Sequence, residues 1–188
     1  MSLKYISESS LIKECLRKNT QAHEELYNKY SRKMFAICYR YTANYHTAED
    51  ILQESFIKIF DNLKSYKGEG SFEGWMKKIV INSALANFRK KKNNNISIDD
   101  DNTFEIAIEE NPFNILSAQE IIGMIQSLPN GYREVLNLYI IDGYAHKEIS
   151  EMLNISEANS KLRLNRARNI LKNILSQSKN LSHESISK

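Results

Sequence analysis

Two stretches of the sequence combine residue types that suit binding to a polyanion. In the first, residues 64–78, the aromatic residues Tyr66, Phe72 and Trp75 alternate with lysines 64, 67, 77 and 78. Bases of a single strand stack on aromatic rings while lysines neutralise phosphates. This pattern therefore indicates a candidate single-strand site. The alternative is that Phe72 and Trp75 belong to the core and that the lysines only solubilise the loop.

The second stretch, residues 158–178, contains no acidic residue and has a helical period. Its apolar face consists of Leu164, Ala167, Leu171 and Ile174. The opposite strip consists of Ala158, Leu162, Asn165 and Asn169, rimmed by Lys161 and Arg168 on one side and Asn159 and Arg166 on the other. Such a strip fits base edges bordered by phosphates, although a solvated basic helix has the same composition. Arg163 lies nearer the core and is predicted to form an internal ion pair.

An acidic helix face is the third candidate site. Residues 47–64 have a core stripe made of Ala48, Leu52, Phe56, Ile59 and Leu63. The opposite stripe consists of Asp50, Gln53, Glu54, Ile57 and Asp61. Ile57 stands where a solvated helix normally has a polar residue, so this face is predicted to dock a basic, partly apolar helix. The alternative is a solvated face with one stray isoleucine.

The residue types of a catalytic or metal centre are present in the sequence, but no motif arranges them for catalysis or metal binding. His23 and His46 have no partner at metal-ligand spacing, and no phosphate-binding glycine motif or catalytic triad is identifiable. Cys15 and Cys38 are predicted to be free core thiols in a reducing compartment. The sequence therefore predicts no catalytic residue, no metal and no cofactor, and a protein that is not an enzyme.

Four helices are predicted to position the first and third sites. Ser9 or Ser10 caps a short helix ending near residue 18, and Thr20 caps a longer one through Tyr41. Helices 47–64 and 72–91 follow, and the latter is apolar nearly all round, which is typical of the central helix of a domain. It ends in a basic run at 89–92, where cations complement the helix dipole.

Helical periodicity stops at residues 93–114, which have six acidic side chains and no Lys or Arg. This segment is predicted to be a flexible linker. Four more helices are then expected: 118–128 with Ser117 as its cap, Pro129 to about 141, 145–153, and a helix from the Ser156 cap to about 175. The last two flank a three-residue turn and predict a helix-turn-helix, whose second helix enters the major groove.

The predicted fold is all-α, with two small helical domains joined by an acidic flexible linker, the C-terminal one containing the helix-turn-helix. The boundaries are 1–92, 93–114 for the linker, 115–176, and 177–188 for a polar tail predicted to be disordered. Only six Gly and two Pro favour helices over a turn-rich β protein. No stretch approaches the roughly 20 apolar residues that span a bilayer, so a cytoplasmic protein without membrane insertion is expected.

Several segments resemble the bacterial sigma factors, above all the small extracytoplasmic-function group. T-A-E-D-I-L-Q-E-S-F-I-K-I-F at 47–60, S-F-E-G-W-M-K-K-I-V-I-N at 71–82 and F-R-K-K at 88–91 are similar to the family's second region. S-L-P, then Y-A-H-K-E-I-S-E-M-L-N-I-S-E, then R-A-R are similar to its fourth region. The resemblance implies a subunit that binds core RNA polymerase, recognises the −35 and −10 promoter elements and promotes DNA melting for transcription initiation.

The resemblance also implies a role for each candidate site. The β′ clamp helices of the polymerase would be bound by Asp50, Gln53, Glu54, Ile57 and Asp61. The −10 element would be captured as a single strand, with a flipped base in the loop, by Lys64, Tyr66, Lys67, Phe72, Trp75, Lys78, Asn82, Arg89 and Lys90. The −35 element would be read as a duplex by Ser156, Asn159, Ser160, Lys161, Leu162, Asn165, Arg166 and Arg168.

Two departures from the family's pattern bear on the promoter sequence. Ala86 stands where the family often has Asp. Ala158-Asn159-Ser160 replaces the usual Gly-Thr-Val, so that Ser160 takes a position that is apolar and in the core in relatives. The target sequence therefore cannot be copied from relatives.

The partners that the resemblance implies are core RNA polymerase, through its β′ and β subunits, promoter DNA, and an anti-sigma factor. The linker would thread the RNA exit path of the polymerase. The protein would be cytoplasmic and nucleoid-associated when bound to polymerase. The main alternative is a helix-turn-helix regulator that binds duplex DNA without polymerase, which explains residues 128–175 but leaves 46–92 without a role.

Overall fold

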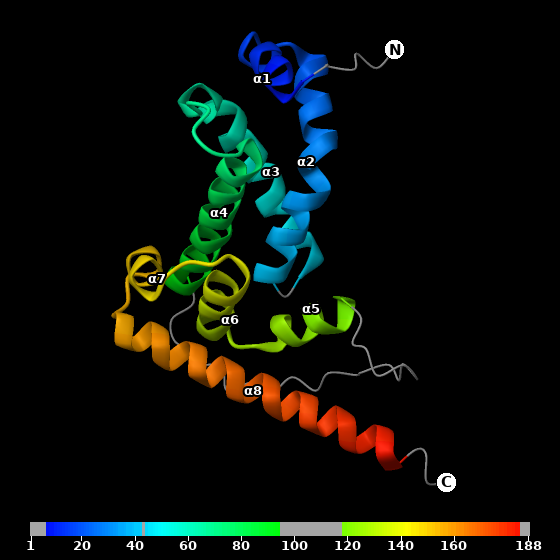
Figure 1. The fold of residues 1–188 in the computed structure, drawn as a ribbon, viewed down its shortest axis with the longest axis vertical. Coiled ribbons are helices and arrows are strands. Elements are labelled where there is room, and N and C mark those ends of the chain that lie inside the picture. Colours follow the sequence, from blue (N-terminus) through cyan, green and yellow to red (C-terminus); the bar gives the residue numbers. More distant parts are fainter. Residues whose placement is uncertain (1–6, 43, 95–117, 185–188) are drawn as a thin grey trace. The chain divides into compact units, whose positions relative to one another are not determined.

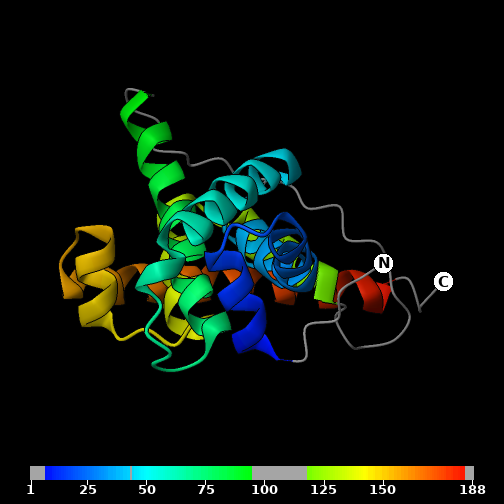
Figure 2. The same ribbon diagram turned by 90° about the horizontal axis from the view of Figure 1, so that it is seen from above.

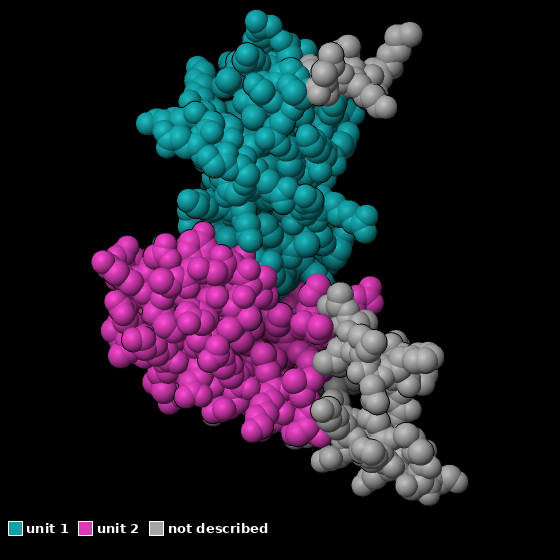
Figure 3. Space-filling model, viewed as in Figure 1, with its two compact units in different colours: residues 1–91 teal, residues 92–188 magenta. Residues whose placement is uncertain are grey.

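The computed structural model describes residues 7–42, 44–94 and 118–184, and the chain divides into two compact units (Figure 3). Unit 1 is Met1–Lys91 and unit 2 is Lys92–Lys188. Every regular element in the described part of the chain is helical, so the all-α prediction is confirmed. Most of the expected linker, from residue 95, lies outside the described residues, as does the expected cap Ser117.

Unit 1 contains four α-helices and one turn of 3₁₀-helix within its described residues. These are α1 (Glu8–Leu16), α2 (Thr20–Tyr41), α3 (Tyr45–Asn62), η1 (Leu63–Ser65) and α4 (Phe72–Asn94). α3 packs against α2, and Figure 2 shows α2 nearly end-on with α3 and α4 crossing its direction. The four predicted helices therefore exist, and the loop with the candidate single-strand site joins η1 to α4.

The helix caps differ from the predicted ones by one to three residues. Ser7 caps α1, because its Oγ accepts from the Ser10 N–H while the Ser10 Oγ accepts from the Ser7 N–H. Asn19 caps α2 with its side-chain oxygen 3.0 Å from the Gln21 nitrogen, so Thr20 is the first helical residue. Asn side chains cap helices better than Thr, which explains this shift. The predictions of Ser9, Ser10 and Thr20 as caps were wrong.

The core of unit 1 contains the predicted apolar stripe of α3. Ala48, Leu52, Phe56, Ile59 and Leu63 are all buried. They share the core with side chains of α2 and α4, among them Leu26, Met34, Cys38, Phe72, Met76, Val80, Ile81 and Leu85. Burial of this stripe fixes the rotation of α3 about its axis, and it therefore directs the acidic stripe to solvent.

Polar contacts between the helices supplement this core. The Lys33 Nζ lies 2.7 Å from the Glu73 Oε2 and joins α2 to α4. The Lys58 Nζ donates to the Ser83 Oγ at 3.0 Å and joins α3 to α4. These two contacts hold α4, the helix that follows the loop with the candidate single-strand site, on two of its sides.

Unit 2 packs three shorter helices against a long one within its described part. The elements are α5 (Ala118–Ser127), α6 (Asn130–Leu136), the π-helical η2 (Asn137–Ile141), α7 (His146–Leu153) and α8 (Glu157–Glu184). Figure 1 shows α6 and α7 lying against α8. The helix expected from Pro129 to about 141 is thus present, but Pro129 is its cap and its last five residues are π-helical.

The predicted disorder of residues 177–188 was wrong for most of that segment, because α8 continues to Glu184. The apolar period ends near residue 175, which suggested an earlier end. No Gly or Pro interrupts residues 176–184, however, and each residue added to an existing helix gains a backbone hydrogen bond. Residues 185–188 lie outside the described part.

A buried arginine connects α5 to α6. Arg133 is 5% exposed, and its Nη2 donates to the main-chain oxygens of Gln126 at 2.5 Å and Leu128 at 2.7 Å. A cation is favourable at these carbonyls because they end a helix. Burial lowers the pKa of Arg133 to about 10, so it remains charged at neutral pH.

Within the described residues, no helix has the length and apolar character needed to cross a membrane.

Candidate nucleic-acid interface

The acidic stripe of α3 faces solvent along its whole length. Its five residues, Asp50, Gln53, Glu54, Ile57 and Asp61, are all exposed. Ile57 is 62% exposed, the largest value among the large apolar side chains of the described residues. Glu54 and Asp61 lie one helical turn before and after it. The face that the sequence predicts for docking is therefore an apolar side chain surrounded by carboxylates.

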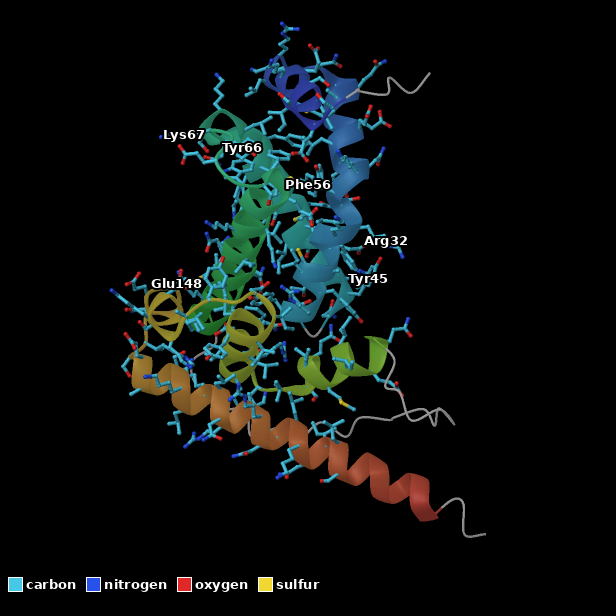
Figure 4. All side chains as sticks on the ribbon, in the orientation of Figure 1. Arg32, Tyr45, Phe56, Tyr66, Lys67 and Glu148 are labelled. Carbon is cyan, nitrogen blue, oxygen red and sulfur yellow. The ribbon has the colours of Figure 1, made fainter. Side chains whose placement is uncertain are left out.

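The loop between η1 and α4 is folded on itself. The Tyr66 hydroxyl donates to the Gly70 carbonyl oxygen at 2.9 Å. Gly68 and Gly70 have φ values of +80° and +77°, which side chains other than glycine rarely adopt. The Tyr66 ring lies 5.6 Å from the Trp75 ring, and Figure 4 shows Tyr66 and Lys67 at this loop. The loop therefore has a defined shape in the free protein.

The structure corrects one residue of the candidate −10 site, because Phe72 is fully buried. Its ring stacks on that of Trp75 at 5.5 Å and meets the edge of Tyr30 at 5.9 Å. The spacing of Phe72, Met76 and Val80 along one side of α4 was the signal of a core position. Tyr66 and Trp75 are half-buried and keep part of their rings at the surface.

The other candidate −10 residues offer polar groups at the surface. Lys64, Lys67, Lys78, Asn82, Arg89 and Lys90 are all exposed. Lys78, Asn82 and Arg89 share one stripe of α4, since the helical period brings positions four and eleven residues apart together. Ala86 is half-buried one turn after Asn82 and has no hydrogen-bonding group. The stripe can therefore bind a strand through cations and one amide.

The turn before α8 has the geometry of a helix-turn-helix. Asn154 ends α7 in the left-handed region with φ of 52°, a conformation that Asn tolerates. The Ser156 Oγ accepts from the Asn159 N–H at 3.1 Å, so the predicted cap of α8 is correct. Ser156 is exposed but its oxygen is used by this cap.

The polar strip of α8 is exposed, and its apolar face is buried at its first two residues and half-buried at Leu171 and Ile174. Leu164 and Ala167 are 4% and 0% exposed, whereas Leu162 is 50% exposed. Besides Ser156, the exposed candidates for −35 binding are Lys161, Leu162, Asn165, Arg166 and Arg168. The unit thus presents a short strip of Ala, Leu and Asn side chains, with cations on both sides, as a surface that fits a DNA groove.

Ser160 must be removed from the candidate −35 site, because its side chain is fully buried. Its Oγ lies 2.8 Å from the His146 Nδ1, and the Tyr139 ring stacks on the His146 ring at 4.4 Å. Partial burial and the cations Lys161 and Arg168 lower the pKa of His146, although Glu157 opposes them. The serine at this core position is therefore satisfied by a histidine of α7.

Arg163 is not in the predicted ion pair. Its Nε donates to the Asn159 Oδ1 at 2.9 Å, and among the described residues no carboxylate is paired with it. Asn159 is half-buried, and this contact uses one lone pair of its side-chain oxygen while its amide N–H groups keep their hydrogens to donate. Because of this hydrogen bond, the Asn159 side chain is less available for a contact with a base than its position at the rim of the strip predicts.

Tyr132 on α6 is a candidate that sequence reasoning missed. Its hydroxyl accepts from the Arg166 Nη1 at 3.1 Å and thereby joins the edge of the α8 strip to α6. The two residues lie 34 positions apart in the chain, so no local pattern could indicate their contact. Arg166 is consequently held on the α6 side of α8.

The described residues provide no arrangement for metal binding. No group of three or more His, Cys, Asp or Glu side chains in this part of the chain could hold an ion. Cys15 and Cys38 are free and buried, and burial raises the pKa of Cys15 to about 11 and that of Cys38 to about 12. Both thiols are therefore protonated at neutral pH and are poor nucleophiles.

Comparisons with known proteins match both parts of the chain that resemble sigma factors. The family model described as Sigma-70 region 2 matches residues 26–94, and the model described as Sigma-70, region 4 matches residues 118–171. The sigma factor SigM of Bacillus subtilis is 32% identical over 152 residues, covering 79% of this chain and 92% of that protein. SigW of the same organism is 31% identical over 173 residues, covering 86% and 92%. Both relatives are described as ECF RNA polymerase sigma factors.

A solved structure has a similar fold. It is the sigma factor RpoE of Bartonella quintana, co-crystallised with the anti-sigma factor NepR. The two folds superpose with a TM-score of 0.53 at 18% identity, over 81% of this chain and 96% of that one.

Proposed function

Since this chain belongs to the extracytoplasmic-function sigma factors, which direct RNA polymerase to promoters and initiate transcription, we propose that three surfaces of its two units divide that work. The α3 stripe binds the polymerase, the loop and α4 bind the melted −10 element, and α8 binds the −35 duplex. The family consists of non-catalytic initiation factors, and we propose that this chain likewise catalyses no covalent step.

The exposure of Ile57 carries the proposal of polymerase docking. An exposed isoleucine has a favourable contact only when a partner covers it, and the carboxylates around it favour a basic partner. The β′ clamp helices are that partner in this proposal. Asp50, Gln53, Glu54 and Asp61 would then orient the contact at its rim, while Ile57 supplies the apolar centre.

The −10 site is proposed to hold the non-duplex strand between the loop and the α4 stripe. The preformed loop supports capture of a flipped base, because a rigid site loses little entropy when it binds. Tyr66 and Trp75 provide the ring surface, while Lys64, Lys67, Lys78, Arg89 and Lys90 provide the cations and Asn82 an amide. Melting is then driven by preferential binding to the open strand, which shifts the equilibrium away from duplex.

The −35 site is proposed to consist of the exposed strip of α8 and its rim. Asn165 has an amide that can form two hydrogen bonds with adenine, and Leu162 suits the methyl group of thymine. Lys161 and Arg168 are exposed cations of α8 whose charges act on His146 of α7, and they fit backbone phosphates. Asn159 contributes its amide N–H groups from the opposite edge.

Two protein partners are further proposals. Unit 2 exposes three consecutive large apolar residues at the π-helix, Tyr139, Ile140 and Ile141, and such a patch supports a protein contact, here proposed to be the polymerase β subunit. An anti-sigma factor is proposed by analogy with RpoE of Bartonella quintana, which was crystallised with one. The protein would act in the cytoplasm, at the nucleoid when bound to polymerase.

The test of this function is run-off transcription with purified bacterial core polymerase on genomic promoter fragments, with and without the protein. New transcripts with defined starts are expected, and the starts locate both promoter elements. No transcript, together with no co-migration of the protein and core polymerase on gel filtration, would reject the proposal in favour of the duplex-binding regulator.

Matched variants test the α3 surface. Glu54→Lys and Ile57→Asp should abolish co-migration with core polymerase while the circular dichroism spectrum stays unchanged, because both side chains are exposed. Glu24→Lys makes the same charge change at an exposed position of α2 and should leave binding intact. Retained binding by Glu54→Lys and Ile57→Asp would show that the polymerase docks elsewhere.

A further inference from the structure

The junction of α6 and α8 gathers polar groups, and two of them, Tyr132 and Arg163, have no part in the proposed roles. The Arg166 Nη1 donates to the Tyr132 hydroxyl at 3.1 Å, across the two helices. The guanidinium of Arg163 lies beside Gly131, so closely that a Cβ there would come within 3.0 Å of its Nη1. Two cationic groups and one hydroxyl therefore meet at this edge of unit 2.

Within the ranges that the structure describes, both guanidinium groups lack an ion-pair partner. Residues 158–178 contain no acid, and among the described residues no carboxylate is paired with either arginine. The Tyr132 hydroxyl accepts from Arg166 and keeps its own O–H to donate. An oxygen anion placed here would receive hydrogen bonds from both Arg166 and Tyr132.

The position of Tyr132 and Arg166 relative to the α8 strip indicates which anion they can bind. Leu162 and Asn165 face outward at the middle of the strip, whereas Arg166 lies at the edge on the α6 side, where Tyr132 holds it. A side chain held at the rim of a recognition helix is placed for the DNA backbone, which runs along both sides of the groove. Arg166 is therefore directed away from base edges.

We propose that Tyr132 and Arg166 form a site for one backbone phosphate of the −35 duplex. This inference rests on the proposed function of α8 and deepens it, since it adds a residue from α6 and changes the role of Arg166 from base reading to positioning. Tyr132 both orients the guanidinium and donates its hydroxyl hydrogen to the phosphate. Base discrimination is left to Leu162 and Asn165, at the middle of the strip.

The test uses the full chain assembled with core polymerase and two promoter duplexes that differ only in the −35 segment. One carries the element found by run-off transcription and the other a scrambled segment. Affinities of the parent, Tyr132→Phe, Arg166→Ala, the double variant and Asn165→Ala are measured over a range of salt concentrations. Tyr27→Phe is the matched control, because it removes an exposed tyrosine hydroxyl from unit 1.

A phosphate contact weakens binding to both duplexes by the same factor. We expect a loss of about 5-fold for Tyr132→Phe and about 10-fold or more for Arg166→Ala, as hydrogen bonds to charged groups are the stronger ones. Arg166→Ala should also lower the salt slope by about 1, because one fewer counterion is released. The double variant should lose less than the product of the single losses, since the residues act together.

Other results would distinguish a failure of the phosphate inference from a failure of the proposed function of α8. If Arg166→Ala weakens only the specific duplex, Arg166 reads a base and the inference is overturned. If Tyr132→Phe behaves like Tyr27→Phe, Tyr132 has no part in DNA binding and the inference is also overturned. If the parent does not distinguish the two duplexes and Asn165→Ala changes nothing, the proposed function of α8 itself fails.

Discussion

At the scale of single residues, the contact between Ser160 and His146 shows how a polar residue is accommodated in a small core. A buried hydroxyl without a partner costs free energy, and the imidazole on α7 supplies that partner at 2.8 Å. His146 is fixed in turn by the ring of Tyr139. The two helices of the helix-turn-helix are therefore connected by a buried hydrogen bond.

The lowered pKa of His146 predicts a pH dependence for unit 2. Because the folded unit disfavours the charged ring, its stability should be complete above the unfolded pKa of about 6.5 and fall as the pH drops through the lower folded pKa. NMR titration of the ring should give a pKa below about 6.5. His146→Gln should remove this part of the pH dependence from urea denaturation curves. A measured ring pKa above that of a free histidine would contradict the prediction.

At the scale of elements, the loop before α4 is closed by one side-chain hydroxyl. Tyr66 donates to the Gly70 carbonyl, and the two glycines with positive φ permit the tight turn between them. The same tyrosine has a half-buried ring next to Trp75. Tyr66 therefore has two separable features, a hydroxyl that closes the loop and a ring surface that a base could stack on.

Tyr66→Phe separates these two features, because it keeps the ring and removes the hydrogen bond. We expect the variant to capture the melted −10 strand less well, by about 0.5 to 1.5 kcal/mol, since the loop must then be ordered on binding. Permanganate reactivity of promoter thymines measures the melting directly. Binding to the −35 duplex should not change. Parent-like melting by Tyr66→Phe, with a defect only in Tyr66→Ala, would mean that the ring alone matters.

At the scale of the whole molecule, each unit has an apolar core of its own. Leu26, Phe56 and Met76 are buried in unit 1, while Leu128 and Leu164 are buried in unit 2. The surfaces proposed for the polymerase and the −10 element both lie on unit 1, and the surface proposed for the −35 element lies on unit 2. Stability of each surface should therefore depend on the core directly beneath it.

Leu26→Ala tests this dependence. The side chain is fully buried, so its truncation should destabilise unit 1 by about 2 to 5 kcal/mol through lost transfer free energy and a cavity. Hydrogen exchange should accelerate in α2, α3 and α4, whereas the amides of α6 and α8 should keep their protection. Equal acceleration in both units would show that they unfold as one.

The candidate surfaces were predictable from sequence to different degrees. Helical periodicity depends only on residues three and four apart, so it identified the exposed stripe around Ile57 and the strip around Leu162. The same spacing puts Phe72 on the core side of its helix, but its aromatic ring beside lysines favoured a DNA contact. The family's pattern makes the position of Ser160 apolar and buried, but its place in the recognition helix favoured a DNA contact. Burial overruled both interpretations.

The sequence by itself determined the helices, their outward faces and the family, because these follow from local spacing and from motifs. Only the tertiary structure decided the polar contacts between helices, such as His146 with Ser160 and Tyr132 with Arg166, which lie 14 and 34 positions apart. Such contacts depend on the register at which two helices cross, and that register is set by the packing of whole apolar faces rather than by any single stretch of residues.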